Sequence, residues 1–197
     1  LFDYYINMTS IGKFFRNSME DFKSQPYAYI EINKAKTVAL KSKLRVKSQL
    51  ICGISWKSYN ASVGQHRSIA LKELIPLFNI KDIYFVDLQY GDVEEEKESL
   101  LKDHGIEIHA VDDISNTNDI EDLFSLVSLC DFVISVSNST VHIAGSIDKT
   151  CYQLLPYHQS DFSWYWHDDE KSIWYPSVTN IRQTKMNSWS DPIESLV

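Results

Sequence analysis

From residue 49 onward, the sequence alternates between short apolar runs and longer amphipathic stretches. Apolar runs of about four to eight residues indicate buried strands, and apolar residues at helical spacing indicate the helices between them. This alternation is typical of β-α-β units, in which a helix connects two parallel strands. The sequence therefore predicts an α/β fold, with a Rossmann-like parallel sheet of about six strands and helices on both of its faces.

The same pattern gives approximate positions for the elements. The expected strands are 49–55, 82–88, 106–111, 131–136, 150–155 and 178–182. The expected helical segments are 69–78, 93–102, 120–127, 141–147 and 189–197. Gly105 is expected to end the second of these helices, and Asp119 lies where the third begins. A turn and helix at 8–19 and a basic helix at 32–44 are expected in the first part of the chain.

Charge divides the chain near residue 48. Of its 19 basic and 27 acidic residues, 9 basic and 4 acidic ones lie in residues 1–48, so this part is basic and the remainder is acidic. A shift in charge of this kind favours a boundary between structural units. We therefore expect one Rossmann-like domain over residues 49–197, with residues 1–48 forming a separate, partly helical segment.

The overall charge and the hydrophobic pattern exclude two classes of protein. A net charge of -8 and an isoelectric point near 5.2 argue against a nucleic-acid partner, which normally selects a basic surface. No uncharged stretch reaches the roughly 20 apolar residues of a bilayer span, so no integral membrane segment is expected. The first residue is Leu1, without a basic flank and an apolar segment, which indicates a fragment and not a signal peptide.

Three cysteines, Cys52, Cys130 and Cys151, lie in or beside apolar runs and form no C-x-x-C pair. An odd number of cysteines in such positions is typical of buried free thiols in a reducing compartment. We therefore expect a cytoplasmic protein.

The turn at 136–145 is the strongest candidate for a ligand site. Ligands of open parallel sheets bind beyond the carboxyl ends of the strands, and here an apolar strand runs through small polar residues into a helix. The free amides and positive dipole end of such a helix suit a phosphate, and His142 lies one turn inside it. The side chains that add donors are Ser137, Asn138, Ser139 and Thr140. The alternative is that Asn138 or Ser139 only caps the helix and that His142 is packed in the core.

Two further turns carry polar residues. Ser55 and Lys57 follow the first strand, and Arg67 comes from the loop after it. Lys57 and Arg67 could neutralise a diphosphate, and the alternative is that they are ordinary surface charges. After the second strand, a glycine suits close backbone approach and an aspartate suits either a ribose hydroxyl or a helix N-cap. The residues of this second turn are Gln89, Tyr90, Gly91 and Asp92.

Other polar and aromatic groups are less specific. Asp112 and Asp113 follow the third expected strand and fit either a hydroxyl-binding pair or an ordinary turn. A block of large rings near residues 162–175 could stack on a base or sugar, although such rings more often belong to the core. Its members are Phe162, Trp164, Tyr165, Trp166, Trp174 and Tyr175, which surround the polar segment 167–171.

Several motifs are missing from the sequence. It contains no G-x-G-x-x-G, no G-x-x-x-x-G-K-[ST] and no G-x-S-x-G, which argues against a dinucleotide site, a P-loop and a nucleophile elbow. It has no D-x-D, and its six histidines lack the spacing of zinc ligands. We therefore expect neither a metal site nor a cofactor.

Taken in order, segments through almost the whole chain resemble one family, the C-terminal, nucleotide-sugar-binding half of GT-B glycosyltransferases of family 9. This family is the heptosyltransferase-like group, and the chain most resembles those members in which the domain follows tetratricopeptide repeats. The matching segments are ICGISWKS (51–58), HRSIALKEL (66–74), FVDLQYGD (85–92), DDI (112–114), 119–156, WYW (164–166), WYPSV (174–178) and RQ (182–183), followed by Trp189. Segments 8–15 and 26–30 look like the connector that leaves an N-terminal domain.

The resemblance implies roles for the polar turns. Ser137, Asn138 and His142 occupy the family's D-T-x-x-x-H pattern, which binds the donor diphosphate, although the usual aspartate and threonine are replaced. The turn from Ser55 to Lys57, together with Arg67, matches other phosphate-side contacts. Residues 89–92 match the turn near the nucleoside. The partner implied is a nucleotide diphosphate sugar, with no metal ion or cofactor.

The resemblance also implies a reaction, the metal-independent transfer of a sugar with inversion. The general base and the pocket for a saccharide or protein acceptor would belong to the protein's own N-terminal domain, so the isolated chain is expected to bind its donor without turnover. Two alternatives stay open. One is a non-catalytic nucleotide-sugar-binding module, and the other is a flavodoxin-like interaction domain that docks a partner through the aromatic block.

Overall fold

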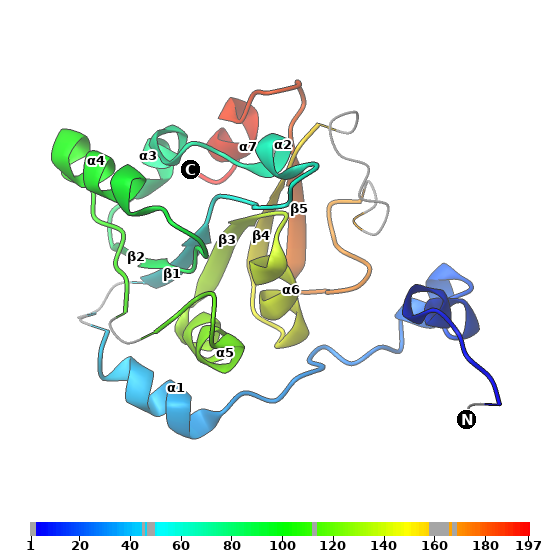
Figure 1. Ribbon diagram of the computed structural model, residues 1–197. Coiled ribbons are helices and arrows are strands. Elements are labelled where there is room, and N and C mark those ends of the chain that lie inside the picture. Colours follow the sequence, from blue (N-terminus) through cyan, green and yellow to red (C-terminus); the bar gives the residue numbers. More distant parts are fainter. Residues whose placement is uncertain (1–2, 45, 47–49, 112–113, 158–165, 167–168) are drawn as a thin grey trace.

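The structure, a computed structural model, describes residues 3–44, 46, 50–111, 114–157, 166 and 169–197. Its centre is a parallel sheet of five strands in the order β2-β1-β3-β4-β5 (Figure 1). The strands are β1 (Leu50–Ser55), β2 (Ile83–Asp87), β3 (Phe132–Val136), β4 (Cys151–Leu155) and β5 (Val178–Arg182). The sheet confirms the α/β class and the Rossmann-like arrangement, with five strands in place of about six.

The prediction of a strand at 106–111 is wrong, because this segment forms one isolated bridge with β2 and no ladder. The amide of His109 donates to the carbonyl of Phe85, and the amide of Asp87 donates to the carbonyl of His109, each at 2.9 Å. Ile108 is buried and belongs to one of the apolar core clusters. The segment therefore has the alternation of a strand because one side of it is buried, although it pairs at a single residue.

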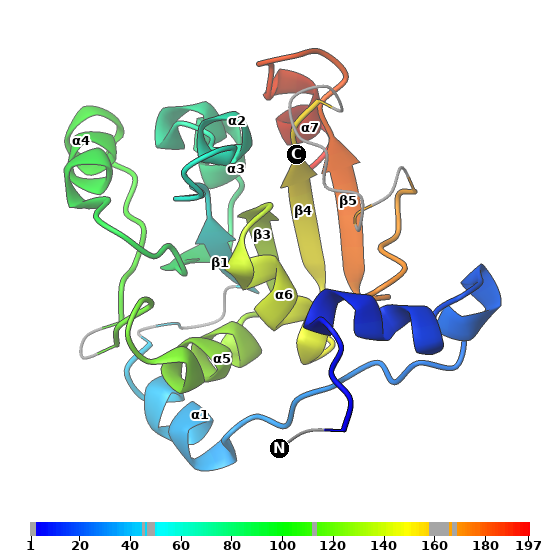
Figure 2. The same ribbon diagram turned by 45° about the vertical axis from the view of Figure 1, so that its right-hand side comes forward.

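Helices cover both faces of the sheet (Figures 1 and 2). One face carries α1 (Lys34–Lys41), α5 (Ile120–Leu129) and α6 (Ser139–Ser146), whose apolar residues form one core cluster with the strands. The other face carries the 3-10 helix η3 (Leu71–Leu74), α3 (Ile75–Phe78), α4 (Glu94–His104) and α7 (Ser190–Glu194), over a second cluster. The short helix α2 (Gly64–Arg67) precedes η3 in the chain. Two apolar layers on opposite faces are what buried parallel strands require.

The helix ends follow the capping residues in the sequence. The Asp119 side chain accepts hydrogen bonds from the amides of Glu121 and Asp122, and Gly105 ends α4 in the left-handed conformation at φ 68°. Pro76 lies in the first turn of α3, where its missing amide hydrogen costs nothing, and α3 begins directly after η3 ends at Leu74. The expected helical segment at 69–78 is therefore divided into two short helices.

The basic first part of the chain packs against an acidic helix start. The Lys36 ammonium of α1 lies 2.8 Å from a carboxylate oxygen of Asp122 and 3.1–3.2 Å from those of Glu121 and Asp119 at the beginning of α5. The segment before α1 contains two 3-10 helices, η1 (Met8–Phe14) and η2 (Met19–Phe22), and its residues 28–30 lie beside the end of α6. The amide of Tyr29 donates to the Ser146 carbonyl there, at 2.7 Å.

All three cysteines are buried and unpaired, which confirms that part of the expectation. Burial raises the pKa of the Cys130 thiol to about 12, so the thiol is protonated and unreactive at neutral pH. Within the described ranges, no helix combines the length and the apolar character needed to cross a bilayer.

Candidate functional site

The strand order places a switch point between β1 and β3. From β1 the chain continues to β2 on one side, whereas β3 leads to β4 on the other, and crevices at such points bind ligands in open α/β sheets. A cleft of about 470 Å³ lies there, above the carboxyl ends of the two strands. The residues that line it are Ser58, Tyr59, Asn60, Arg67, Tyr90, Ser137, Asn138, Ser139 and His142. The cleft therefore brings together residues from each of the three turns that the sequence singled out.

Asn138 joins two sides of the cleft. Its Oδ1 accepts from the amide of Thr140 at 2.9 Å and so caps α6, and it also accepts from the Ser135 hydroxyl at 3.1 Å. Its Nδ2 donates to Ser55 Oγ at 2.8 Å and to the Lys57 carbonyl at 3.0 Å. The capping role that the sequence left open is thus observed, and the same amide holds the β1 turn against α6.

Gln89 closes the β1 turn from the other side. Its Oε1 accepts from the amides of Trp56 and Lys57, each at 2.8 Å, and from Ser55 Oγ at 3.1 Å. Its Nε2 donates to the Tyr90 carbonyl at 2.7 Å. Gln89 and Ser55 are both buried, so they shape the floor of the site and satisfy the amides of this turn internally.

The groups that face the cleft come mainly from α6 and the end of α2. Ser139 is the first residue of α6 and is exposed, so the positive end of the helix dipole meets the cleft there. Arg67 Nη1 lies 3.5 Å from the carbonyl of Ser137, whose hydroxyl accepts from Trp166 Nε1 at 2.9 Å. Thr140 is fully buried and does not line the cleft.

His142 is half-buried and held by two rings. Its Nδ1 lies 3.2 Å from the Tyr175 hydroxyl, and its ring stacks on Trp166 with centroids 4.9 Å apart. Burial lowers the pKa of His142 below its ordinary value, and the positive charge of Arg67 lowers it further. The imidazole is therefore neutral at pH 7. In this state one ring nitrogen is a donor and the other an acceptor, so the ring can donate or accept one hydrogen bond at the cleft.

Gly145 makes room for this arrangement. A Cβ atom at Gly145 would lie 2.3 Å from Cγ of Tyr175, so only glycine lets that ring pack against α6 beside His142. Two members of the aromatic block, Trp166 and Tyr175, thus support the imidazole. Trp174 instead packs edge-on against Phe22, at 4.9 Å between ring centroids. The remaining candidates of that region, Phe162, Trp164, Tyr165, His167 and Asp168, lie outside the described residues, as do Asp112 and Asp113.

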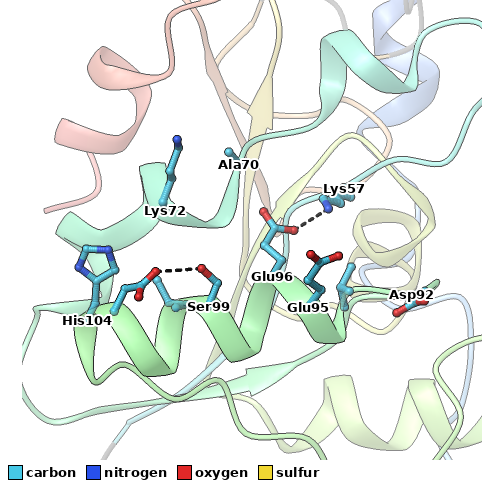
Figure 3. Close-up of a pocket in the computed structure, with 11 residues that line it drawn as sticks. Lys57, Ala70, Lys72, Asp92, Glu95, Glu96, Ser99 and His104 are labelled. Carbon is cyan, nitrogen blue, oxygen red and sulfur yellow. Dashed lines mark hydrogen bonds and ion pairs between the residues drawn. The ribbon is translucent and has the colours of Figure 1, made fainter.

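Lys57 points away from this cleft. Its ammonium pairs with the Glu96 carboxylate at 2.5 Å, and both residues line a separate pocket of about 480 Å³ between η3 and α4 (Figure 3). Burial by itself raises the pKa of Glu96, but hydrogen bonds from Lys57, from the Leu71 amide and from Trp56 hold it below the ordinary value. Glu96 thus neutralises the lysine, which the structure places apart from Arg67 and His142.

The turn after β2 is also divided between the two pockets. Tyr90 lines the cleft, whereas Asp92 lines the pocket of Lys57 and offers its carbonyl to the Tyr59 hydroxyl at 2.9 Å. Gly91 adopts a positive φ of 84°, which favours glycine. Tyr59 and Asn60 line the cleft without having been predicted. Their signal in the sequence was their place directly after the first strand, in the same turn as Ser55.

Within the described ranges, no three histidine, cysteine, aspartate or glutamate side chains gather in a way that could hold a metal ion. The absence of a metal requirement stays a prediction.

No family model matches this sequence. Among curated proteins, Protein FlbA of Caulobacter vibrioides is 28% identical over 190 residues, which are 95% of this chain and 31% of that protein. The chain thus spans about a third of the length of this relative.

Two solved glycosyltransferase structures share the fold. E. coli ADP-heptose LPS heptosyltransferase II has a TM-score of 0.57 and 12% identity, over 85% of this chain and 51% of that one. The glycosyl transferase family 9 protein from Veillonella parvula DSM 2008 has a TM-score of 0.54 and 10% identity, over 81% of this chain and 44% of that one. The chain therefore has the α/β fold of about half of each of these enzymes.

Proposed function

We propose that this chain is the donor-binding part of a glycosyltransferase that uses a nucleotide diphosphate sugar, and that the cleft at the β1–β3 switch point holds the diphosphate. The observation that carries the proposal is the meeting of three anion-binding groups at one place. They are the start of α6, the guanidinium of Arg67 and the imidazole of His142. The described residues that line the cleft include Arg67 and neither aspartate nor glutamate, although the whole chain has a net charge of -8.

Each group suits a diphosphate for a different reason. The guanidinium offers paired donors that match phosphate oxygens, and the amides at the start of a helix point at an anion in front of it. A neutral imidazole donates a hydrogen bond without the repulsion that a second cation beside Arg67 would add. When the glycosidic bond to the donor phosphate breaks, negative charge grows on the leaving diphosphate. Donors already fixed in place stabilise that charge.

The fold likeness supports the same reading, since heptosyltransferase II is an ADP-heptose enzyme by name and the other structure is a family 9 glycosyltransferase. The chain spans only about half of each, so we assign the acceptor pocket and the general base to a part of the protein outside this chain. In this proposal, transfer is metal-independent and inverts the anomeric centre, and the chain alone binds the donor without turnover.

A second function, binding without catalysis, is favoured by Ser137. The resemblance implies an aspartate at this position, and the uncharged hydroxyl that replaces it accepts a hydrogen bond from Trp166 Nε1 at 2.9 Å. The two functions share the diphosphate site and differ only in turnover. Sugar transfer by the full-length protein decides between them.

The site itself is tested by isothermal titration of this chain with inorganic pyrophosphate, ADP and UDP. Arg67→Ala and His142→Ala should each weaken diphosphate binding by about 1–3 kcal/mol, as expected for loss of a hydrogen bond to a charged group. Lys72→Ala is the matched control, because it removes one exposed positive charge that lies in the other pocket. Equal affinity in the two cleft variants and the control would contradict the proposal.

A further inference from the structure

We infer that Tyr59 and Tyr90 form a stacking platform for the nucleobase of the donor. This inference rests on the proposed function, because it assigns the part of the ligand beyond the diphosphate. Both residues line the cleft, and their ring centroids lie 5.6 Å apart with the planes tilted by 51°.

The exposure of Tyr59 is the first reason. The residue is 51% exposed, although its hydroxyl donates a hydrogen bond to the Asp92 carbonyl at 2.9 Å. The hydroxyl of Tyr90 accepts from the amide of Tyr59 at 3.4 Å, a weaker contact that still draws the two turns together. Both hydroxyls thus make hydrogen bonds within the protein, and Tyr59 remains half exposed at the cleft. An anchored but exposed aromatic ring is suited to stacking on a flat ligand.

The backbone beneath the ring is the second reason. A Cβ atom on Gly91 would lie 2.5 Å from two carbons of the Tyr59 ring, so the ring rests directly on the glycine. Gly91 also has a φ of 84°, where side chains other than hydrogen are strained. The turn after β2 is therefore shaped to receive the ring of the turn after β1.

The order of the strands gives the direction in which a ligand would lie. The anion-binding groups Ser139 and His142 follow β3, whereas Tyr59 follows β1 and Tyr90 follows β2. In the sheet, β1 lies between β3 and β2. A nucleotide whose diphosphate lies at the start of α6, after β3, can therefore extend its nucleoside toward the turns after β1 and β2, where the two tyrosines lie. A planar base presents a ring face to such a pair, and stacking on aromatic side chains accepts every base. Because both hydroxyls are engaged within the protein, the platform contributes affinity and little base selectivity.

The test compares ligands that have and lack a base. This chain and its Tyr59→Ala, Tyr59→Phe and Tyr59→Leu variants are titrated with ADP, UDP, inorganic pyrophosphate and glucose 1-phosphate. Loss of the ring in Tyr59→Ala should weaken the binding of ADP and UDP by about tenfold and leave the affinity for pyrophosphate unchanged. Tyr59→Phe should bind all of these ligands with nearly the original affinity. Tyr59→Leu keeps apolar bulk without a π face, so it should behave like the alanine variant. It also provides a second test if Tyr59→Ala fails to fold.

Several outcomes would overturn the inference. Unchanged ADP and UDP affinity in the alanine and leucine variants removes the platform and leaves the diphosphate site standing. An equal loss for pyrophosphate means that Tyr59 only shapes the anion site. A loss confined to glucose 1-phosphate means that the tyrosines hold the sugar and not the base. Failure of the unsubstituted chain to bind any of the four ligands rejects the proposed function itself, which distinguishes the two failures.

Discussion

Nδ2 of Asn138 donates a hydrogen bond to Oγ of Ser55 at 2.8 Å, although 83 positions separate the two residues in the chain. Ser55 in turn donates to Oε1 of Gln89 at 3.1 Å. Because these residues stand at the ends of β3, β1 and β2, one buried series of side chains connects the three turns that surround the candidate site.

The first prediction concerns this connection. Asn138→Ala should lower the free energy of unfolding by about 2 kcal/mol, because it removes the cap of α6 and leaves the Lys57 carbonyl without that donor. Urea unfolding followed by circular dichroism measures the change. Asn33→Ala is the control, since Asn33 caps the start of α1 at an exposed position and should cost about 1 kcal/mol. A smaller loss for Asn138→Ala than for Asn33→Ala would count against the connecting role.

The second prediction concerns pH. Since burial, and then Arg67, lower the pKa of His142 in the folded protein, the unfolded chain binds a proton at His142 more readily than the folded one. The contribution of His142 to stability is therefore complete above the unfolded pKa of about 6.5, and it is lost as pH falls from there through the folded pKa. Between pH 7.5 and 5.5, the original chain should lose more stability than the His142→Gln variant. Parallel pH profiles for the two proteins would reject the assignment.

The third prediction concerns the packing of Tyr175. Gly145→Ala should destabilise the protein by about 1–3 kcal/mol, because the new methyl group would lie 2.3–2.6 Å from ring carbons of Tyr175. Alanine is the better helix former by about 1 kcal/mol, so a net loss shows that overpacking dominates. Gly12→Ala serves as the comparison, because nothing lies within 4 Å of the added Cβ. The stability of the protein should barely change in this variant. Thermal unfolding of the two variants measures both effects, and a gain for Gly145→Ala would show that the ring moves aside freely.

The strands were predictable because parallel strands in a doubly covered sheet are apolar over their whole length. The runs at 131–136 and 150–155 therefore indicated β3 and β4 to within one residue. The run at 106–111 was wrongly predicted to be a strand. Burial of Ile108 produces an alternation of apolar and polar residues whether or not the backbone pairs with a neighbouring strand. Hydrophobic periodicity reports which side chains are buried and does not report the partner of the backbone.

The site was predictable at the level of turns and less so at the level of side chains. The sequence singled out the three turns of Ser55, Gln89 and Ser139, and hydrogen bonds between their side chains and the lining of the cleft show that these turns meet. Which side chains face the cleft depends on contacts between distant segments. Lys57 turns to Glu96, and Gln89 turns inward to the amides of the β1 turn. Tyr59 was missed because its ring packs against Gly91, which lies 32 positions later in the sequence.

The buried amides of Asn138 and Gln89 have a consequence for how a ligand would enter. Three loops that would otherwise fluctuate separately are fastened into one rigid base, whereas exposed side chains such as Ser139 and Tyr59 remain at its rim. Entry of a ligand then needs adjustment of rim side chains only, so little backbone entropy is lost and most of the interaction energy is retained as affinity.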